Sequence, residues 1–97
     1  MKLSYPEVFM KIKNGFVIEK VGTSYLAVAV GERAAEFSNM VRLNSTGAFL
    51  WNCLADADLT HDELVDKVLA AYDVSREVVL ADILAFEKTL KDNGILE

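Results

Sequence analysis

The sequence predicts a single α+β domain of the winged-helix-like type, in which a three-stranded antiparallel β-meander precedes three helices. Three observations support this prediction. The chain has 97 residues, the size of one domain with one core. β-branched and aromatic residues are concentrated between residues 16 and 43, and helix-capping residues with helical apolar spacing follow from residue 44 onward. The expected order is therefore βββααα, with the sheet and the helices burying their apolar faces against each other.

Residues 14–97 are expected to form this domain, and residues 1–13 to be a loose N-terminal arm. The arm mixes polar and apolar residues without a clear period. Pro6 disfavours both a helix and a central strand around its position. Nothing in the arm predicts a packed element.

Two runs rich in β-branched and aromatic residues, at 16–21 and 24–30, predict a β-hairpin. Gly22 lies between them, where a tight turn favours a residue that tolerates positive φ. Gly31 ends the second strand. Residues 32–39 show no regular pattern, and we expect a loop there.

Residues 40–43 predict a short third strand. Alternation places Met40 and Arg42 on one face, and Val41 and Leu43 on the other. Because this strand is short and last in the meander, we expect it at the edge of the sheet. Its unpaired N–H and C=O groups could then accept an added strand.

The first helix is expected to begin at Asn44 or Ser45, both of which are favourable N-cap residues. Residues 48–54 are apolar nearly all round the helix, so this helix should be the buried centre of the domain. The Asp-Ala-Asp sequence at residues 56–58 ends it.

Two further helices follow. Thr60 with Glu63 three residues later predicts a capping box, which opens a second helix that runs to about Tyr72. A third helix is expected over residues 76–93, with Ser75 as its N-cap.

The third helix carries more apolar residues than one buried stripe needs. On a helical projection the core stripe comprises Val79, Ile83, Phe86 and Leu90. A flank beside that stripe carries Leu80 and Leu84 and continues to Glu87. An open strand edge next to a partly apolar helix flank is a suitable site for an extended peptide.

Residues suited to catalysis are scarce. His61, the single histidine, lies in the first turn of the second helix, and we expect a solvated side chain there. Cys53 lies in the apolar first helix, where it is expected to be a small buried hydrophobe. One Cys and one His do not supply a metal site, and the five glycines form no phosphate-binding cluster. We therefore expect no enzyme activity, no metal and no cofactor.

The charge distribution argues against nucleic acid as a partner. Residues 1–48 carry six basic and four acidic side chains, net +2, whereas residues 49–97 carry four basic and eleven acidic ones, net −7. The charge-free stretch at residues 43–55 is shorter than the roughly 20 residues that a bilayer requires, so no membrane partner is expected. A single Cys favours a reducing, cytoplasmic setting.

Residues 43–51, Leu-Asn-Ser-Thr-Gly-Ala-Phe-Leu-Trp, resemble the LN-x-T-G-x-x-x-W signature of the PqqD-like family. The similarity extends over about residues 14–97. Its further positions are Leu64, Tyr72-Asp73-Val74, Asp82-Ile83, Phe86, Leu90 and Gly94-Ile95-Leu96.

The resemblance implies a peptide chaperone that recognises the leader of a ribosomally made precursor peptide and hands it to a maturase, often a radical-SAM enzyme. The leader adds as a strand to the third strand and packs against the third helix. On this sequence the implied peptide-binding residues are Met40, Val41, Arg42 and Leu43 on the strand, with Leu80, Leu84 and Glu87 on the helix. The choice of helix flank rests on the apolar pattern of this chain. Because the sequence ends at Glu97 without a catalytic domain, we expect a stand-alone recognition element.

Two other functions stay open. A winged-helix DNA-binding regulator is one, because the second and third helices resemble a helix-turn-helix in spacing. The third helix has four acidic and three basic residues, however, whereas DNA-reading helices are basic. A structural partner subunit of an enzyme complex is the other. Binding to a short linear peptide would favour the chaperone, and salt-sensitive binding to duplex DNA would favour the regulator.

Overall fold

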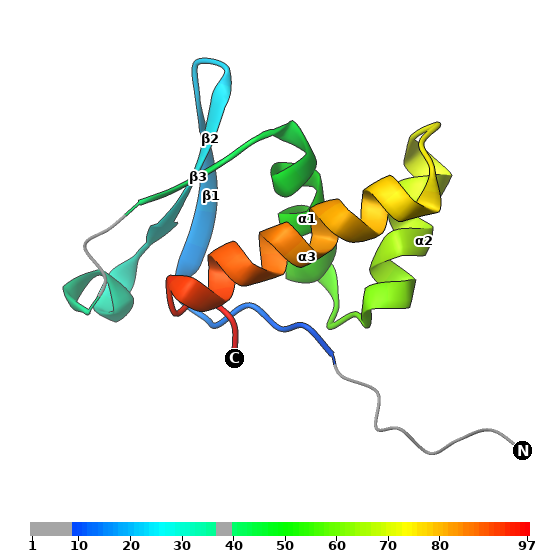
Figure 1. Cartoon of the computed structure of the whole chain (residues 1–97). Helices are drawn as coiled ribbons and strands as arrows, with labels where there is room; N and C mark the ends of the chain where they lie inside the picture. Colours follow the sequence, from blue (N-terminus) through cyan, green and yellow to red (C-terminus); the bar gives the residue numbers. More distant parts are fainter. Residues whose placement is uncertain (1–8, 37–39) are drawn as a thin grey trace, which may run out of the picture.

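The computed structural model describes residues 9–36 and 40–97. Within these residues the chain forms a three-stranded sheet, then three α-helices, with a short 3-10 helix between the second and third strands (Figure 1). The elements are β1 (Phe16–Val21), β2 (Ser24–Ala29), η1 (Gly31–Ala35), β3 (Val41–Leu43), α1 (Ser45–Asp56), α2 (His61–Ala71) and α3 (Arg76–Asp92). The predicted α+β class and the βββααα order are confirmed.

The sheet is an antiparallel meander in the order β1-β2-β3. Gly22 has a φ of 62° and begins the two-residue turn of the first hairpin, as its position between the two strands predicts. Strand β3 pairs with β2 in a register that places Leu43 opposite Tyr25 and Val41 opposite Ala27. This order leaves β3 at the edge of the sheet.

The segment after the hairpin is not the loop expected from the sequence. Residues 31–35 form the 3-10 helix η1, and the guanidinium of Arg33 in it donates from Nε to the carbonyl of Asn14 at 3.0 Å. A second guanidinium nitrogen contacts the carboxylate of Glu36 at 3.3 Å. The contact with Asn14 spans 19 residues, so a local pattern could not reveal it. The remainder of the expected loop, residues 37–39, lies outside the described residues.

The loose arm expected at residues 1–13 is also wrong where the structure describes it. Met10 is buried, with 2% of its surface exposed, and its N–H donates to the carbonyl of Leu59 at 2.8 Å. Ile12 forms an isolated antiparallel bridge with Leu96. Residues 10–13 therefore pack between the α1–α2 connection and the C-terminal end, while residues 1–8 lie outside the described residues.

The helix starts follow the expected caps. The side-chain oxygen of Asn44 accepts a hydrogen bond from the N–H of Gly47 at 2.7 Å and caps α1. Thr60 and Glu63 form the predicted capping box at the start of α2. Ser75 caps α3 by accepting from the N–H of Val78.

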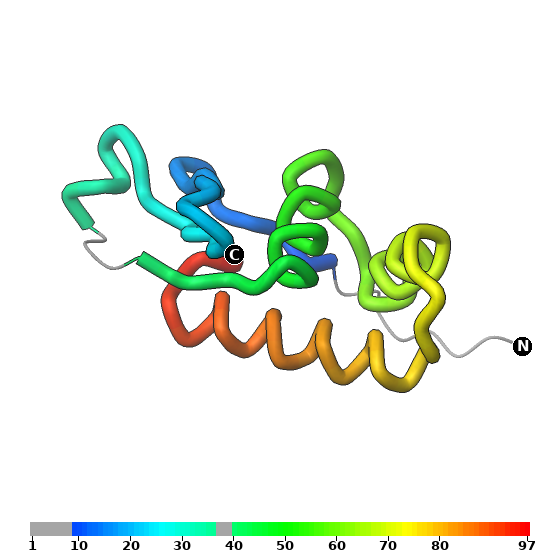
Figure 2. The backbone as a smooth tube through the Cα atoms, turned by 90° about the horizontal axis from the view of Figure 1, so that it is seen from above, coloured from blue at the N-terminus to red at the C-terminus, as the bar shows by residue number. Residues whose placement is uncertain are grey.

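Helix α1 is the buried centre of the domain, as predicted. Leu50, Trp51 and Leu54 are all buried, and α1 contacts both other helices and strands β2 and β3. The predicted core stripe of α3 is confirmed, since Val79, Ile83, Phe86 and Leu90 are buried in the same cluster. Figure 2 shows α3 along one side of the molecule, starting beside α2 and ending near the strands. Helix α3 therefore reaches from the other helices to the sheet.

Candidate functional site

The outer edge of β3 is the first component of the site. Val41 and Leu43 are buried beneath the strand, whereas Met40 and Arg42 are exposed, so the predicted alternation is confirmed. Strand β2 occupies one side of β3, and within residues 9–36 and 40–97 no strand pairs with the other side. The backbone of β3 can therefore accept a further strand at this edge.

A close strand-to-helix connection positions α1 directly beside this edge. Asn44 follows β3 immediately and caps α1. Gly47 packs so closely that a Cβ atom built on it would lie 3.3 Å from the Cβ of Leu43 and 3.3 Å from the side-chain oxygen of Asn44. A side chain at position 47 would therefore press on Leu43 and Asn44, and glycine lets α1 return closely against the strand without that crowding.

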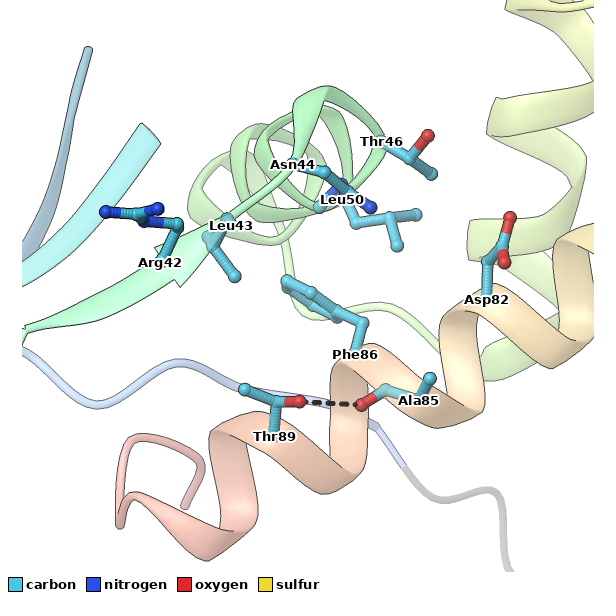
Figure 3. A pocket seen from close by; sticks show the side chains of 10 residues that line it. Arg42, Leu43, Asn44, Thr46, Leu50, Asp82, Ala85, Phe86 and Thr89 are labelled. Atoms are coloured by element: carbon cyan, nitrogen blue, oxygen red, sulfur yellow. Dashed lines mark hydrogen bonds between the residues drawn. The ribbon is translucent and has the colours of Figure 1, made fainter. Parts of the chain in front are cut away.

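A cavity of about 180 Å³, here called the strand cavity, lies between this connection and α3 (Figure 3). Leu43, Leu50 and Phe86 provide its apolar surface. The α3 side carries Asp82 at the end where α1 begins and Thr89 toward the other end. The full lining is Arg42, Leu43, Asn44, Thr46, Gly47, Leu50, Asp82, Ala85, Phe86 and Thr89.

A second cavity, of about 110 Å³ and here called the valine cavity, continues the first toward the start of α3. The two share Thr46, Leu50 and Asp82. The other residues lining the valine cavity are Ser45, Val68, Tyr72, Val74, Val78, Val79 and Ile83. The sequence pattern did not predict this cavity. Its one signal was Val78, a large apolar residue outside the predicted core stripe, which is 54% exposed in the structure.

The structure places Val41, Arg42 and Leu43 on β3, with Met40 directly before the strand. It does not bring the predicted helix residues to them. The flank of α3 that lines the strand cavity carries Asp82, Ala85 and Thr89. Leu80, Leu84 and Glu87 lie on the opposite flank of the core stripe. The expectation that these three residues face the groove beside β3 is therefore corrected.

Glu87, on that opposite flank, contacts the start of α2. Its Oε1 is 3.0 Å from Nε2 of His61, at the start of α2, and its Oε2 is 3.8 Å from Nζ of Lys91. The side chain of His61 is only 30% exposed. The expected solvated histidine is therefore wrong, because the imidazole is held against α3.

Cys53 is partly buried, away from both cavities of the groove. Burial raises the pKa of its thiol above the usual value, although Lys67 nearby acts in the opposite direction. It lines a separate cavity with Lys67, Phe49 and Asp56. No group of three or more His, Cys, Asp or Glu residues within the described part of the chain could hold a metal ion.

None of the helices in residues 9–36 and 40–97 has the length and apolar character that crossing a bilayer requires.

The architecture of the described residues is a winged-helix-like α+β domain with an open strand edge beside a helix-lined groove. The chain belongs to the PqqD family, since the sequence model of "Coenzyme PQQ synthesis protein D (PqqD)" matches residues 19–96. The predicted resemblance is confirmed. No curated protein matches the chain in sequence.

Two solved structures share the fold. One is TbiB1 in complex with the TbiA(beta) leader peptide, with a TM-score of 0.70 and 24% identity, covering 91% of this chain and 95% of that one. The other is a lasso peptide synthetase B1 complexed with the leader peptide, with a TM-score of 0.68 and 19% identity, covering 91% of this chain and 96% of that one. At these identities the likeness shows a common fold.

Proposed function

We propose that this domain binds the leader of a ribosomally made precursor peptide, which adds as a strand to the free edge of β3. The observation that carries the proposal is the open edge of β3 lying alongside two connected cavities on α3. Membership of the PqqD family supports it, as do the leader peptides bound to both structural neighbours. Strand addition supplies affinity through the backbone, and the cavities supply side-chain specificity.

The proposed contacts keep the strand residues expected from the sequence and change those on the helix. Met40, Val41, Arg42 and Leu43 present the strand to the peptide. On α3 the contacts are Asp82, Ala85, Phe86 and Thr89, in place of Leu80, Leu84 and Glu87. The hydroxyl of Thr89 donates to the carbonyl of Ala85 at 3.0 Å. This internal bond leaves the hydroxyl oxygen to accept from a ligand.

The proposed role is recognition without catalysis. The domain would present the bound precursor to a maturase, and radical-SAM enzymes are the class that the family resemblance implies. Its single His and single Cys lie outside the groove, His61 against Glu87 and Cys53 beside Lys67. The single Cys also supports a cytoplasmic setting.

A titration of the isotope-labelled domain tests the proposal. The probes are synthetic peptides covering the N-terminal halves of the short reading frames that flank its gene. One peptide should bind with a Kd of about 1 μM, roughly −8 kcal/mol, because ordering a disordered leader offsets part of the contact energy. Amide shifts should concentrate at Val41–Leu43 and along the Asp82–Thr89 side of α3. Shifts confined to β1, or no binding by any peptide, would contradict strand addition at β3.

Duplex DNA is the control ligand for the regulator alternative. The three basic residues of α3 are each paired with an acidic side chain: Arg76 with Asp62 and Asp66, Lys88 with Asp92, and Lys91 with Glu87. A recognition helix needs basic side chains available for phosphates and bases. Salt-sensitive DNA binding at micromolar protein would favour the regulator over the peptide chaperone.

A further inference from the structure

Asp82 occupies a distinctive position in the groove. It lines both the strand cavity and the valine cavity, so it marks the point where they join. Its side chain makes no ion pair or hydrogen bond with any residue in the described ranges. The basic residues on its own helix are already paired with other acids. Asp82 is exposed, so its carboxylate is open to solvent at the groove and available to a ligand.

The surroundings of Asp82 are otherwise neutral. Every other residue that lines the valine cavity is uncharged, and most are aliphatic. Arg42 is the single basic residue in the lining of the strand cavity, and it extends away from α3 toward the hairpin in Figure 3. The surrounding half of the chain, residues 49–97, has a net charge of −7. The field at this point of the groove therefore favours a cation.

The valine cavity has the size and chemistry for one apolar side chain. Its volume is about 110 Å³. A dry apolar cavity of roughly 150 Å³ accepts benzene, so this space suits a branched aliphatic group. Tyr72, Val74 and Val78 form its exposed rim, each at least 43% exposed, so the pocket is accessible to a ligand.

We propose that Asp82 is a specificity-determining residue, which selects leader peptides that place a Lys or Arg opposite its carboxylate and a branched aliphatic side chain in the valine cavity. The inference rests on the proposed function and names the class of leader. Because Asp82 lines both cavities, the two leader residues lie within a few positions of each other, at roughly 3.3 Å per residue of extended chain. The charge also distinguishes the intended leader from acidic peptides, which the carboxylate repels.

A display selection tests the inference without knowledge of the natural leader. The probe is a phage library of random peptides of about 12 residues, long enough at roughly 3.3 Å per residue to pass both cavities. It is selected in parallel on the wild-type domain, on Asp82→Asn, on Asp82→Lys and on Val78→Ser. Glu77→Gln is the matched control, an exposed acid on the same helix that lines neither cavity.

Peptides enriched on the wild-type domain and on Glu77→Gln should share a Lys or Arg near a Val, Leu or Ile. Asp82→Asn should lose the preference for the basic residue, Asp82→Lys should replace it with Asp or Glu, and Val78→Ser should weaken the aliphatic preference. For one enriched peptide, replacing its basic residue with Ala should weaken binding about threefold to fivefold on the wild-type domain, and not on Asp82→Asn.

The outcomes separate this inference from the function on which it rests. Peptides that bind at β3 but show no basic preference, or the same preference on Asp82→Lys, would overturn the role of Asp82 and leave leader binding intact. Failure of the wild-type domain to enrich any peptide would overturn both. The melting temperature of each variant shows whether it is folded, so that the loss of a sequence preference can be distinguished from unfolding of the domain.

Discussion

His61 and Glu87, 26 residues apart in the chain, approach to 3.0 Å between Nε2 and Oε1. Glu87 lies on the same flank of α3 as Leu80 and Leu84, so this flank is the one beside the start of α2. The opposite flank, with Asp82, Ala85 and Thr89, lines the strand cavity beside β3. The orientation of α3 about its own axis thus decides which side chains a peptide on β3 would meet.

Ala85→Arg should block peptide binding without unfolding the domain. Ala85 is exposed on α3 and lines the strand cavity of about 180 Å³, which a long charged side chain would occupy. Because Arg is nearly as favourable as Ala in a helix, the melting temperature should change little. Fluorescence polarisation with a peptide selected on the wild-type domain should show at least about tenfold weaker binding, equivalent to 1.4 kcal/mol.

Leu84→Arg is the matched control for that prediction. Leu84 is 49% exposed on the opposite flank of the same helix, so this variant should bind the peptide as the wild type does. The reverse pattern, with Leu84→Arg weakened and Ala85→Arg normal, would return the groove to the flank expected from the sequence.

Phe86→Ala should lower the stability of the whole domain. Phe86 is buried in the core and also forms part of the strand cavity, so truncation removes apolar burial and leaves a void. The expected loss is roughly 3–5 kcal/mol in the free energy of unfolding. Urea denaturation measures it, with Leu84→Ala as the exposed comparison, expected within about 0.5 kcal/mol of wild type. Equal losses for the two variants would contradict the assignment of the core stripe.

Met10→Ala should destabilise the domain although Met10 precedes the first strand. Its side chain is 2% exposed and belongs to the core cluster, so the expected cost is roughly 2–5 kcal/mol. The neighbouring Phe9 is 51% exposed, and Phe9→Ala should cost little. Denaturation curves of the two variants distinguish a packed segment from a loose one, because a loose segment would tolerate both changes.

His61→Ala should reduce stability modestly and leave peptide binding unchanged. The variant loses the contact with Glu87, whose side chain is only 13% exposed, and an interaction of this kind contributes about 1 kcal/mol. Its peptide affinity should stay within a few-fold of wild type, because His61 lines neither cavity of the groove. Loss of precursor modification with fold and binding intact would instead indicate a catalytic role for the imidazole.

The features that could be predicted from the sequence are those that depend on neighbours a few residues apart. Asn44 caps α1 by accepting a hydrogen bond from the N–H of Gly47, and Thr60 and Glu63 form the capping box of α2. Each of these contacts spans three residues. The burial of Val41 and Leu43 could also be predicted, because the side chains of a strand alternate between its two faces. Local spacing also identified the core stripe of α3, because residues three and four apart share one face of a helix.

Which flank of that stripe faces β3 depends on packing between distant segments, so it could not be predicted from the sequence. A stripe on a helix has two flanks, and the periodicity of the sequence does not distinguish them. The apolar residues Leu80 and Leu84 therefore favoured a flank that does not line the strand cavity. The packing of α3 against α2 and α1 removes this ambiguity. The burial of Met10 against Leu59 and the bond from Arg33 to Asn14 have the same origin. Each joins segments distant in the chain, and such contacts form only once the core has brought them together.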